Sequence, residues 1–200
     1  MIPSDGSETM QGRLLDERVV TLFGRLDDAA VSDLAARLWS LDAIGDAPIN
    51  LLLSVSASTT SAAAALVDVT DVIGVELHAT CIGAMNGPAV AVLAAAQRRE
   101  AGPNARFVLR DEPVAFQGSF RDLEESARQH QAQRLQLLAR LAESTGGRRS
   151  IEAVLADFDR GLALSAEEAR DYGIIDHIAL ERGRVASISQ LKSGFGFRRP

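Results

Sequence analysis

The amino-acid sequence predicts a single α/β domain with a mostly parallel sheet. Short apolar runs alternate along the chain with helical patterns, as they do where helices connect parallel strands. The run INLLLSV at 49–55 is apolar at nearly every position, which is typical of a strand covered on both faces. The chain has 200 residues, 46% of them apolar, which is enough for one compact core.

The predicted elements follow in order from the N-terminus. A strand at 19–23 precedes a helix at 29–43, which Asp27 and Asp28 can cap. The elements predicted after them are a strand at 49–55, a loop of small polar residues at 56–61, an alanine-rich helix ending at 73, a strand at 77–82, a helix starting near 87, a strand at 106–109, a long amphipathic helix at 121–144, helices at 151–158 and 166–172, and a strand at 174–176. We expect flexible tails at 1–11 and 181–200 around a domain at 12–180.

Composition excludes several classes of function. The net charge of −6 does not favour a nucleic-acid or anionic-membrane partner. Cys81 is the one cysteine, so neither a disulfide framework nor a cysteine-based metal site is possible. No histidine spacing indicates a metal site, and we expect no metal and no cofactor. The sequence has neither a signal peptide nor a run long enough to span a bilayer, so we expect a cytoplasmic protein.

The stretch from Cys81 to Ala96 combines a strand, a sharp turn and a buried helix. Free N–H groups at such a helix start can hold an oxyanion, and a hydrolase would place a serine or cysteine nucleophile on the turn. Here the turn reads Met85-Asn86-Gly87-Pro88, which contains no nucleophilic side chain. The architecture therefore indicates a catalytic turn, whereas the residues do not.

From residue 13 to residue 178 the sequence resembles the ClpP family, the serine peptidase subunits of the Clp protease. RLLDERVVTLFGRLDDAAV is similar to that family's opening region, and GRRSIEAVLADFDRGLALSAEEARDYGIID to its closing region. The long helix resembles the family's handle helix, through which two heptameric rings interdigitate. The resemblance implies a ClpP/crotonase-like spiral of ββα units with a protruding handle helix.

The resemblance also implies that the catalytic triad is substituted. The family's serine turn, C-x-G-x-A-A-S-M-G-A, matches CIGAMNGPA with Gly87 at the serine position. PNARFVLR places Arg110 at the histidine position, and DFDRG places Gly161 at the aspartate position. Acyl transfer needs a nucleophile, a base and an orienting acid. Glycine offers no nucleophilic atom, and a guanidinium remains protonated and cannot act as a base.

Further family positions concern the oxyanion loop and assembly. Ala57 and Ser58 stand where the family has the glycine pair of its oxyanion loop, and Pro88 follows the nucleophile position. Asp159 and Arg160 match a pair that forms salt bridges between rings in the family. The resemblance thus predicts an inactive subunit of heptameric or double rings, formed alone or with an active paralogue. We do not expect docking of an AAA+ unfoldase on this ring alone, because Leu52 replaces an aromatic residue.

Two alternatives remain open from the sequence. The chain is an active Clp serine endopeptidase subunit if the alignment of the turn is wrong. It is a crotonase-like acyl-CoA binder if the similarity of AMNGPA and NARF to the crotonase family is the more informative one, although Val90, Ala91 and Val92 replace that family's glycines. The hydroxyl and imidazole groups that we expect to have only structural roles are Ser54, Ser56, Ser58, Ser61, His78, His130 and His177.

Overall fold

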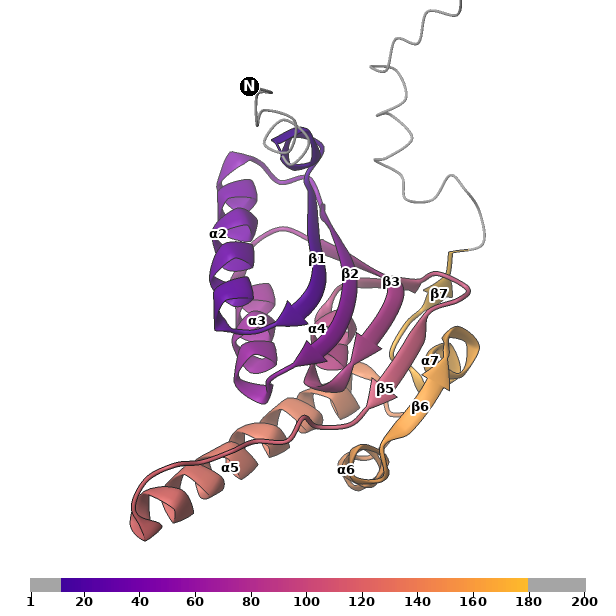
Figure 1. The fold of residues 1–200 in the computed structure, drawn as a ribbon. Coiled ribbons are helices and arrows are strands. Elements are labelled where there is room, and N and C mark those ends of the chain that lie inside the picture. The colour runs from indigo at the N-terminus through magenta and orange to yellow at the C-terminus, as the bar shows by residue number, and fades with distance from the viewer. Residues whose placement is uncertain (1–11, 180–200) are drawn as a thin grey trace, which may run out of the picture.

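The structure is a computed structural model that describes residues 12–179, and the predicted tails at 1–11 and 181–200 lie outside these residues. The described chain forms an α/β fold in which helices pack against a largely parallel sheet (Figure 1). The predicted fold class is therefore confirmed. A short helix at residues 12–16 precedes the first strand.

One sheet runs through the described residues, with strands in the order β1-β2-β3-β4-β7. The strands are β1 (Val19–Leu26), β2 (Ile49–Ser58), β3 (Leu77–Asn86), β4 (Arg98–Ala101), β5 (Arg106–Leu109), β6 (Leu162–Ser165) and β7 (His177–Ile178). All pairs are parallel except β5 with β6. The strand β3 divides the sheet, because its first half pairs with β4 and its last residues pair with β5. The C-terminal ends of β3 and β5 therefore lie next to each other.

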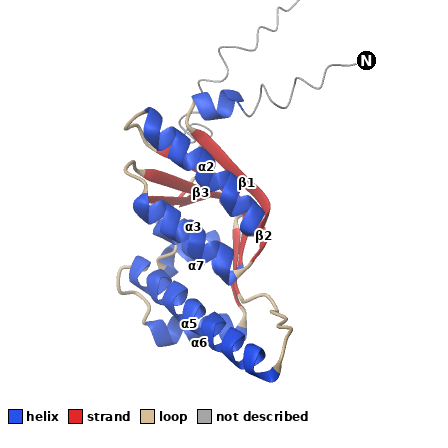
Figure 2. Ribbon diagram, turned by 90° about the vertical axis from the view of Figure 1, so that its left-hand side faces the viewer, coloured by secondary structure: helices blue, strands red, loops and turns tan. Residues whose placement is uncertain are grey.

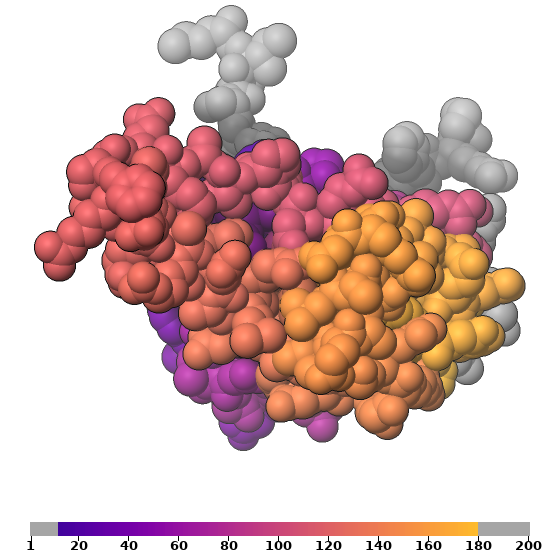
Figure 3. All heavy atoms as spheres, turned by 90° about the horizontal axis from the view of Figure 1, so that it is seen from below, coloured from indigo at the N-terminus to yellow at the C-terminus, as the bar shows by residue number. Residues whose placement is uncertain are grey.

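Helices cover one side of this sheet and extend below it. They are α2 (Asp28–Ile44), α3 (Thr60–Val72), the 3-10 turn η1 (Gly87–Ala89), α4 (Val90–Ala95), α5 (Phe120–Ser144), α6 (Ile151–Arg160) and α7 (Ala166–Tyr172). The helix α3 packs between α2 and α5 (Figure 2). Seen from below, α5 runs beside the region of α6 and α7 (Figure 3).

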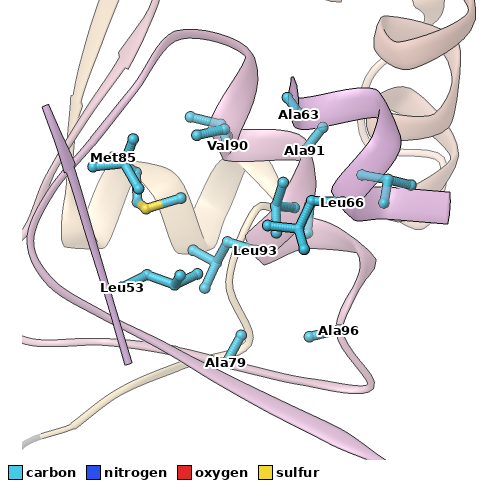
Figure 4. Packing of buried hydrophobic residues seen from close by; sticks show 14 of the residues in the cluster. Leu53, Ala63, Leu66, Ala79, Met85, Val90, Ala91, Leu93 and Ala96 are labelled. Carbon is cyan, nitrogen blue, oxygen red and sulfur yellow. The ribbon is translucent and has the colours of Figure 1, made fainter. Parts of the chain in front are cut away.

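The core lies where α3 and α4 meet the central strands. Ala63 and Ala91 let these two helices approach closely, and Leu53 and Met85 fill the space beside the sheet (Figure 4). All four side chains are buried. Cys81 on β3 is also buried, and loss of water around its thiol raises its pKa to about 12. It is therefore a packing residue rather than a reactive thiol.

The helix α5 has an uneven environment along its length. Its buried residues, Leu137, Leu138, Leu141 and Ala142, all lie in its last turns, whereas its first half projects away from the body of the molecule (Figure 1). A capping box formed by Ser119 and Asp122 fixes its start. The protruding amphipathic helix that the sequence predicts is present in this form.

Several predicted boundaries are wrong in an informative way. The strand predicted at 49–55 continues to Ser58, so most of the predicted loop at 56–61 belongs to β2 and the start of α3. The strand predicted at 77–82 continues to Asn86, and the sharp turn comes at Gly87. The strands β4 and β6 were not predicted. The predicted strand at 174–176 is instead a buried connection before β7, because the apolar side chains of Ile174 and Ile175 pack into the core without sheet pairing.

Arg99 on β4 connects this last segment to the rest of the molecule. Its guanidinium donates to the carbonyl oxygens of Ser144 (2.6 Å) and Gly173 (3.1 Å), and it forms a two-pronged ion pair with the carboxylate of Asp176. Hydrogen bonds from Arg99 lower the pKa of Asp176 below its usual value. One half-buried arginine therefore joins β4, the end of α5 and the C-terminal segment.

We expect Gly173→Ala to destabilise the fold. Gly173 ends α7 with φ of 99°, and a Cβ atom there would lie 2.8 Å from the carbonyl oxygen of Thr145. Strain and clash together should lower the free energy of unfolding by roughly 2–4 kcal/mol, measured by urea denaturation. Gly146→Ala is the matched control, because its φ is 65° and an added Cβ meets nothing within 4 Å, so it should cost about 1 kcal/mol. Equal losses in the two variants would contradict this explanation.

We expect Asp176→Asn to remove a pH-dependent contribution to stability. The pKa of Asp176 is lower in the folded than in the unfolded protein, so the contribution is fully present above the ordinary carboxyl pKa of about 3.9 and is lost as the pH falls through the folded-state pKa. The difference in free energy of unfolding between wild type and variant should therefore be constant from about pH 5 to pH 7 and shrink below about pH 4.

Urea denaturation at a series of pH values tests this expectation. The control is Asp171→Asn, because the Asp171 side chain is 72% exposed and its ion pair with Arg170 should contribute little. A difference for Asp176→Asn that stays the same below about pH 4 would show that the ion pair is not the source of the acid dependence.

Candidate functional site

Three residues from distant parts of the chain meet at one end of the sheet. Gly87 follows β3, Arg110 follows β5, and Gly161 separates α6 from β6. A Cβ atom at Gly87 would lie 3.0 Å from the carbonyl oxygen of Arg110. A Cβ atom at Gly161 would lie 2.5 Å from Nε of Arg110. The structure thus brings together the three positions that the sequence analysis singled out as the substituted triad.

Sheet register explains why these three positions are neighbours. Asn86 pairs with Val108 in the parallel ladder of β3 and β5, so both chains leave the sheet together. Leu109 pairs with Leu162 in the antiparallel ladder of β5 and β6, so the next residue outward on each strand is Arg110 or Gly161. Neither contact depends on a flexible loop.

Both glycines have left-handed backbone conformations. The φ angle is 69° at Gly87 and 70° at Gly161, where other residues would be strained by about 1–2 kcal/mol. Gly161 also terminates α6, since its N–H donates to the carbonyl oxygens of Asp157 and Phe158. The missing side chain at Gly161 is filled by the guanidinium of Arg110, which lies where a side chain would begin.

Ser58 occupies the turn that an oxyanion site would use. Its hydroxyl donates to the carbonyl oxygen of Asn86 (2.9 Å) and accepts from the N–H of Ala89 (2.9 Å). Ser58 is fully buried, and its Oγ would lie 3.2 Å from a Cβ atom at Gly87. Pro88 has no N–H to offer. The start of η1 therefore presents neither the Pro88 nor the Ala89 amide to a ligand.

A network of ion pairs surrounds the three positions. Arg134 of α5 joins Asp111 (2.6 Å) to Asp159 (2.7 Å), which connects the residue after Arg110 with the end of α6. Asp111 Oδ1 is buried without a hydrogen-bond partner among the described residues. These contacts hold the base of α5 against the site.

The predicted assembly pair is engaged within the same chain. Asp159 pairs with Arg134, and Arg160 pairs with Asp157 (2.6 Å). Asp157 also accepts a hydrogen bond from the buried hydroxyl of Tyr172 (2.8 Å), and burial together with this bond raises the pKa of Tyr172. The side chains of Asp159 and Arg160 are nevertheless 69% and 63% exposed. Their role in assembly stays a prediction.

A cleft of about 260 Å³ opens beside Ser58. Its walls are residues 58–61, residues 112–115, Arg25 and His130. Arg25 and Glu112 form an ion pair across it (2.7 Å), and the ring of Phe116 meets that of His130 edge-on at 6.0 Å. The sequence analysis did not place His130 here, because the contact between α5 and the chain before it is non-local and leaves no local signal.

The remaining hydroxyls and histidines have ordinary partners. Thr59 caps α3 by accepting from the N–H of Ala62 (3.2 Å) and contacts the Ser61 hydroxyl (3.2 Å). His78 lies beside Glu76 (3.3 Å). Among residues 12–179 there is no cluster of side chains that could hold a metal ion and no helix long and apolar enough to cross a membrane.

Known proteins of one family resemble this chain over most of its length. The model of the Clp protease family matches residues 4–182. ATP-dependent Clp protease proteolytic subunit 2 of Corynebacterium jeikeium is 31% identical over 170 residues, which cover 83% of this chain and 80% of that relative. The corresponding subunit 2 of Mycobacterium leprae is 31% identical over 171 residues, covering 83% and 79%. Subunit 1 of Mycolicibacterium paratuberculosis is 31% identical over 171 residues, covering 83% and 80%.

We expect Gly161→Ala and Arg110→Ala to be energetically coupled. In the wild-type background a methyl group at position 161 displaces the guanidinium of Arg110, which would lie 2.5 Å away, in addition to straining the backbone. In the Arg110→Ala background only the backbone strain remains. A double-mutant cycle measured by urea denaturation should give a coupling of at least about 0.5 kcal/mol.

The control cycle combines Arg110→Ala with Gly147→Ala. Gly147 has φ of 82°, and an added Cβ atom there meets nothing within 4 Å, so these two changes should be additive. If Gly161→Ala and Arg110→Ala are additive as well, the guanidinium does not lie against Gly161 in solution.

Proposed function

Because this chain belongs to the Clp protease family, we propose that it is a subunit of a Clp-type protease that has lost peptidase activity. The proposal is supported above all by the meeting of Gly87, Arg110 and Gly161 at the end of β3 and β5. An error in aligning one segment would not bring three substituted positions from three distant segments together. The resemblance assigns these positions to serine, histidine and aspartate in active members.

The chemistry of the site supports the loss of activity at each step. Gly87 has no atom that can attack a carbonyl carbon. Arg110 cannot accept a proton from a nucleophile, because its guanidinium stays positively charged. Loss of the nucleophile alone typically lowers a peptidase rate by about a million-fold. Loss of an oxyanion donor, here through Pro88 and the occupied Ala89 amide, typically costs a further 100-fold or so.

Assembly into rings is supported by α5 and the chain before it. The described residues leave large apolar side chains uncovered there, with Val114 50%, Phe120 77% and Leu135 47% exposed. A neighbouring subunit would bury such a surface. We propose a ring of seven or two stacked rings in the cytoplasm, formed by this chain alone or with an active paralogue. The relatives' names describe proteolytic subunits of an ATP-dependent protease, and this chain would be a structural or regulatory member of such a complex.

The two alternatives are less favoured by the geometry of the turn. An active serine peptidase would need a nucleophile beside a base, and the hydroxyl nearest to Gly87, that of Ser58, is buried and already donates to Asn86. A crotonase-like enzyme would need free amides for a thioester oxygen, but Ser58 occupies the Ala89 amide. Val90 is also packed in the core, where that family's glycine would allow a ligand to approach.

Activity measurements test the proposal directly. The purified protein should neither hydrolyse a fluorogenic peptide nor be labelled by a fluorophosphonate, whereas an active Clp proteolytic subunit assayed in parallel does both. Gly87→Ser should remain inactive, because Arg110 cannot serve as its base and Ser58 still fills the turn. Labelling of any serine in the wild-type protein would falsify the proposed loss of activity.

Native mass measurement tests the assembly. We expect a mass of seven or fourteen subunits, either for this chain alone or after mixing with an active paralogue. A protein that stays monomeric in both samples would overturn the proposal of a ring subunit, whatever its activity.

A further inference from the structure

We propose that the vacated catalytic position binds a carboxylate group of a peptide and that Arg110 holds it. This inference rests on the proposed loss of peptidase activity, because the guanidinium stands where an active enzyme would have its base. Three observations lead to it: the uncompensated charge of Arg110, the space left by two glycines, and the adjoining cleft.

The acidic side chains next to Arg110 in the sequence or in the structure are already paired with other arginines. The pairs are Asp111 and Asp159 with Arg134, Glu112 with Arg25, and Asp157 with Arg160. Arg110 itself is exposed and has no ion pair within residues 12–179. Its positive charge therefore lacks an intramolecular partner, although four carboxylates lie on the neighbouring segments.

The two glycines leave room beside this charge. The guanidinium lies against Gly161, where any side chain would collide with Nε or Nη2 at 2.5 Å. Gly87 leaves the other side of the Arg110 backbone without a side chain. A small planar anion can approach the guanidinium in this space. Arginine presents a planar fork of N–H groups that matches the two oxygens of a carboxylate.

The surroundings favour a peptide carboxylate over a phosphate. The neighbouring acids Asp111 and Asp159 would repel a doubly charged anion more strongly than a singly charged one. The cleft beside Ser58 runs between two chain segments, residues 58–61 and 112–115, and can accept the residues that precede a terminal carboxylate. The carboxylate is either the C-terminus of the peptide or an Asp or Glu side chain, and the experiment separates these two sources.

Binding of three fluorescein-labelled tetrapeptides to the purified full-length protein tests the inference. The first peptide is tetra-alanine with a free C-terminal carboxylate, the second is the same peptide amidated, and the third is amidated but carries one internal glutamate. At low ionic strength, fluorescence anisotropy should show that at least one carboxylate peptide binds about tenfold or more tightly than the amidated tetra-alanine. Arg110→Gln should reduce this preference to less than about twofold, and Arg110→Lys should retain part of it.

Arg106→Gln is the matched control, since Arg106 is an exposed arginine on the same strand, and it should leave the preference unchanged. The inference is overturned if no peptide binds, if acid and amide bind equally, or if Arg110→Gln keeps the preference. Native mass and fluorophosphonate labelling of the same samples keep the two proposals apart. An inactive ring without the carboxylate preference refutes only this inference, whereas a labelled or permanently monomeric protein refutes the proposed function.

Discussion

The pairing of β5 with both β3 and β6 is the constraint on which the candidate site depends. Through the first pair, Gly87 and Arg110 leave the sheet together, and through the second, Arg110 lies next to Gly161. A shift of one residue in either ladder would turn alternate side chains to the opposite face and separate the three positions. The apolar side chains of Phe107 and Leu109 are fully buried and oppose such a shift. Core packing, rather than any contact within the site, therefore fixes the site's geometry.

The sequence was sufficient for the parts of the fold that rest on long apolar or amphipathic patterns. Helix boundaries near Asp27, Ser150 and Ser165 followed from capping chemistry and agree with the structure. The strand β4 was missed because it reads RREA, and its charged side chains pair along its length instead of showing an apolar pattern. The strand β6 was missed because it is short and follows a helix without a loop.

At the candidate site, sequence reasoning identified positions but not interactions. The motifs placed Gly87, Arg110 and Gly161, whereas the role of Ser58 as a partner of Asn86 and Ala89 follows only from the crossing of β2 and β3. The bridge made by Arg134 was equally inaccessible, because it joins residues separated by 23 and 25 positions. Long side chains that reach across a fold leave no periodic pattern in the sequence.

The projecting half of α5 has a consequence for the fate of single subunits. A helix that lacks tertiary packing is marginally stable in water, so this half depends on its capping box and on local pairs such as Glu125 with Arg128. In a free subunit it should open far more often than the core, and a protease could cut it there. Contact with a neighbour would suppress this opening. The helix would thus make the lifetime of each copy depend on whether it has found its partners, so that unassembled copies are removed and the subunit ratio of the complex is kept.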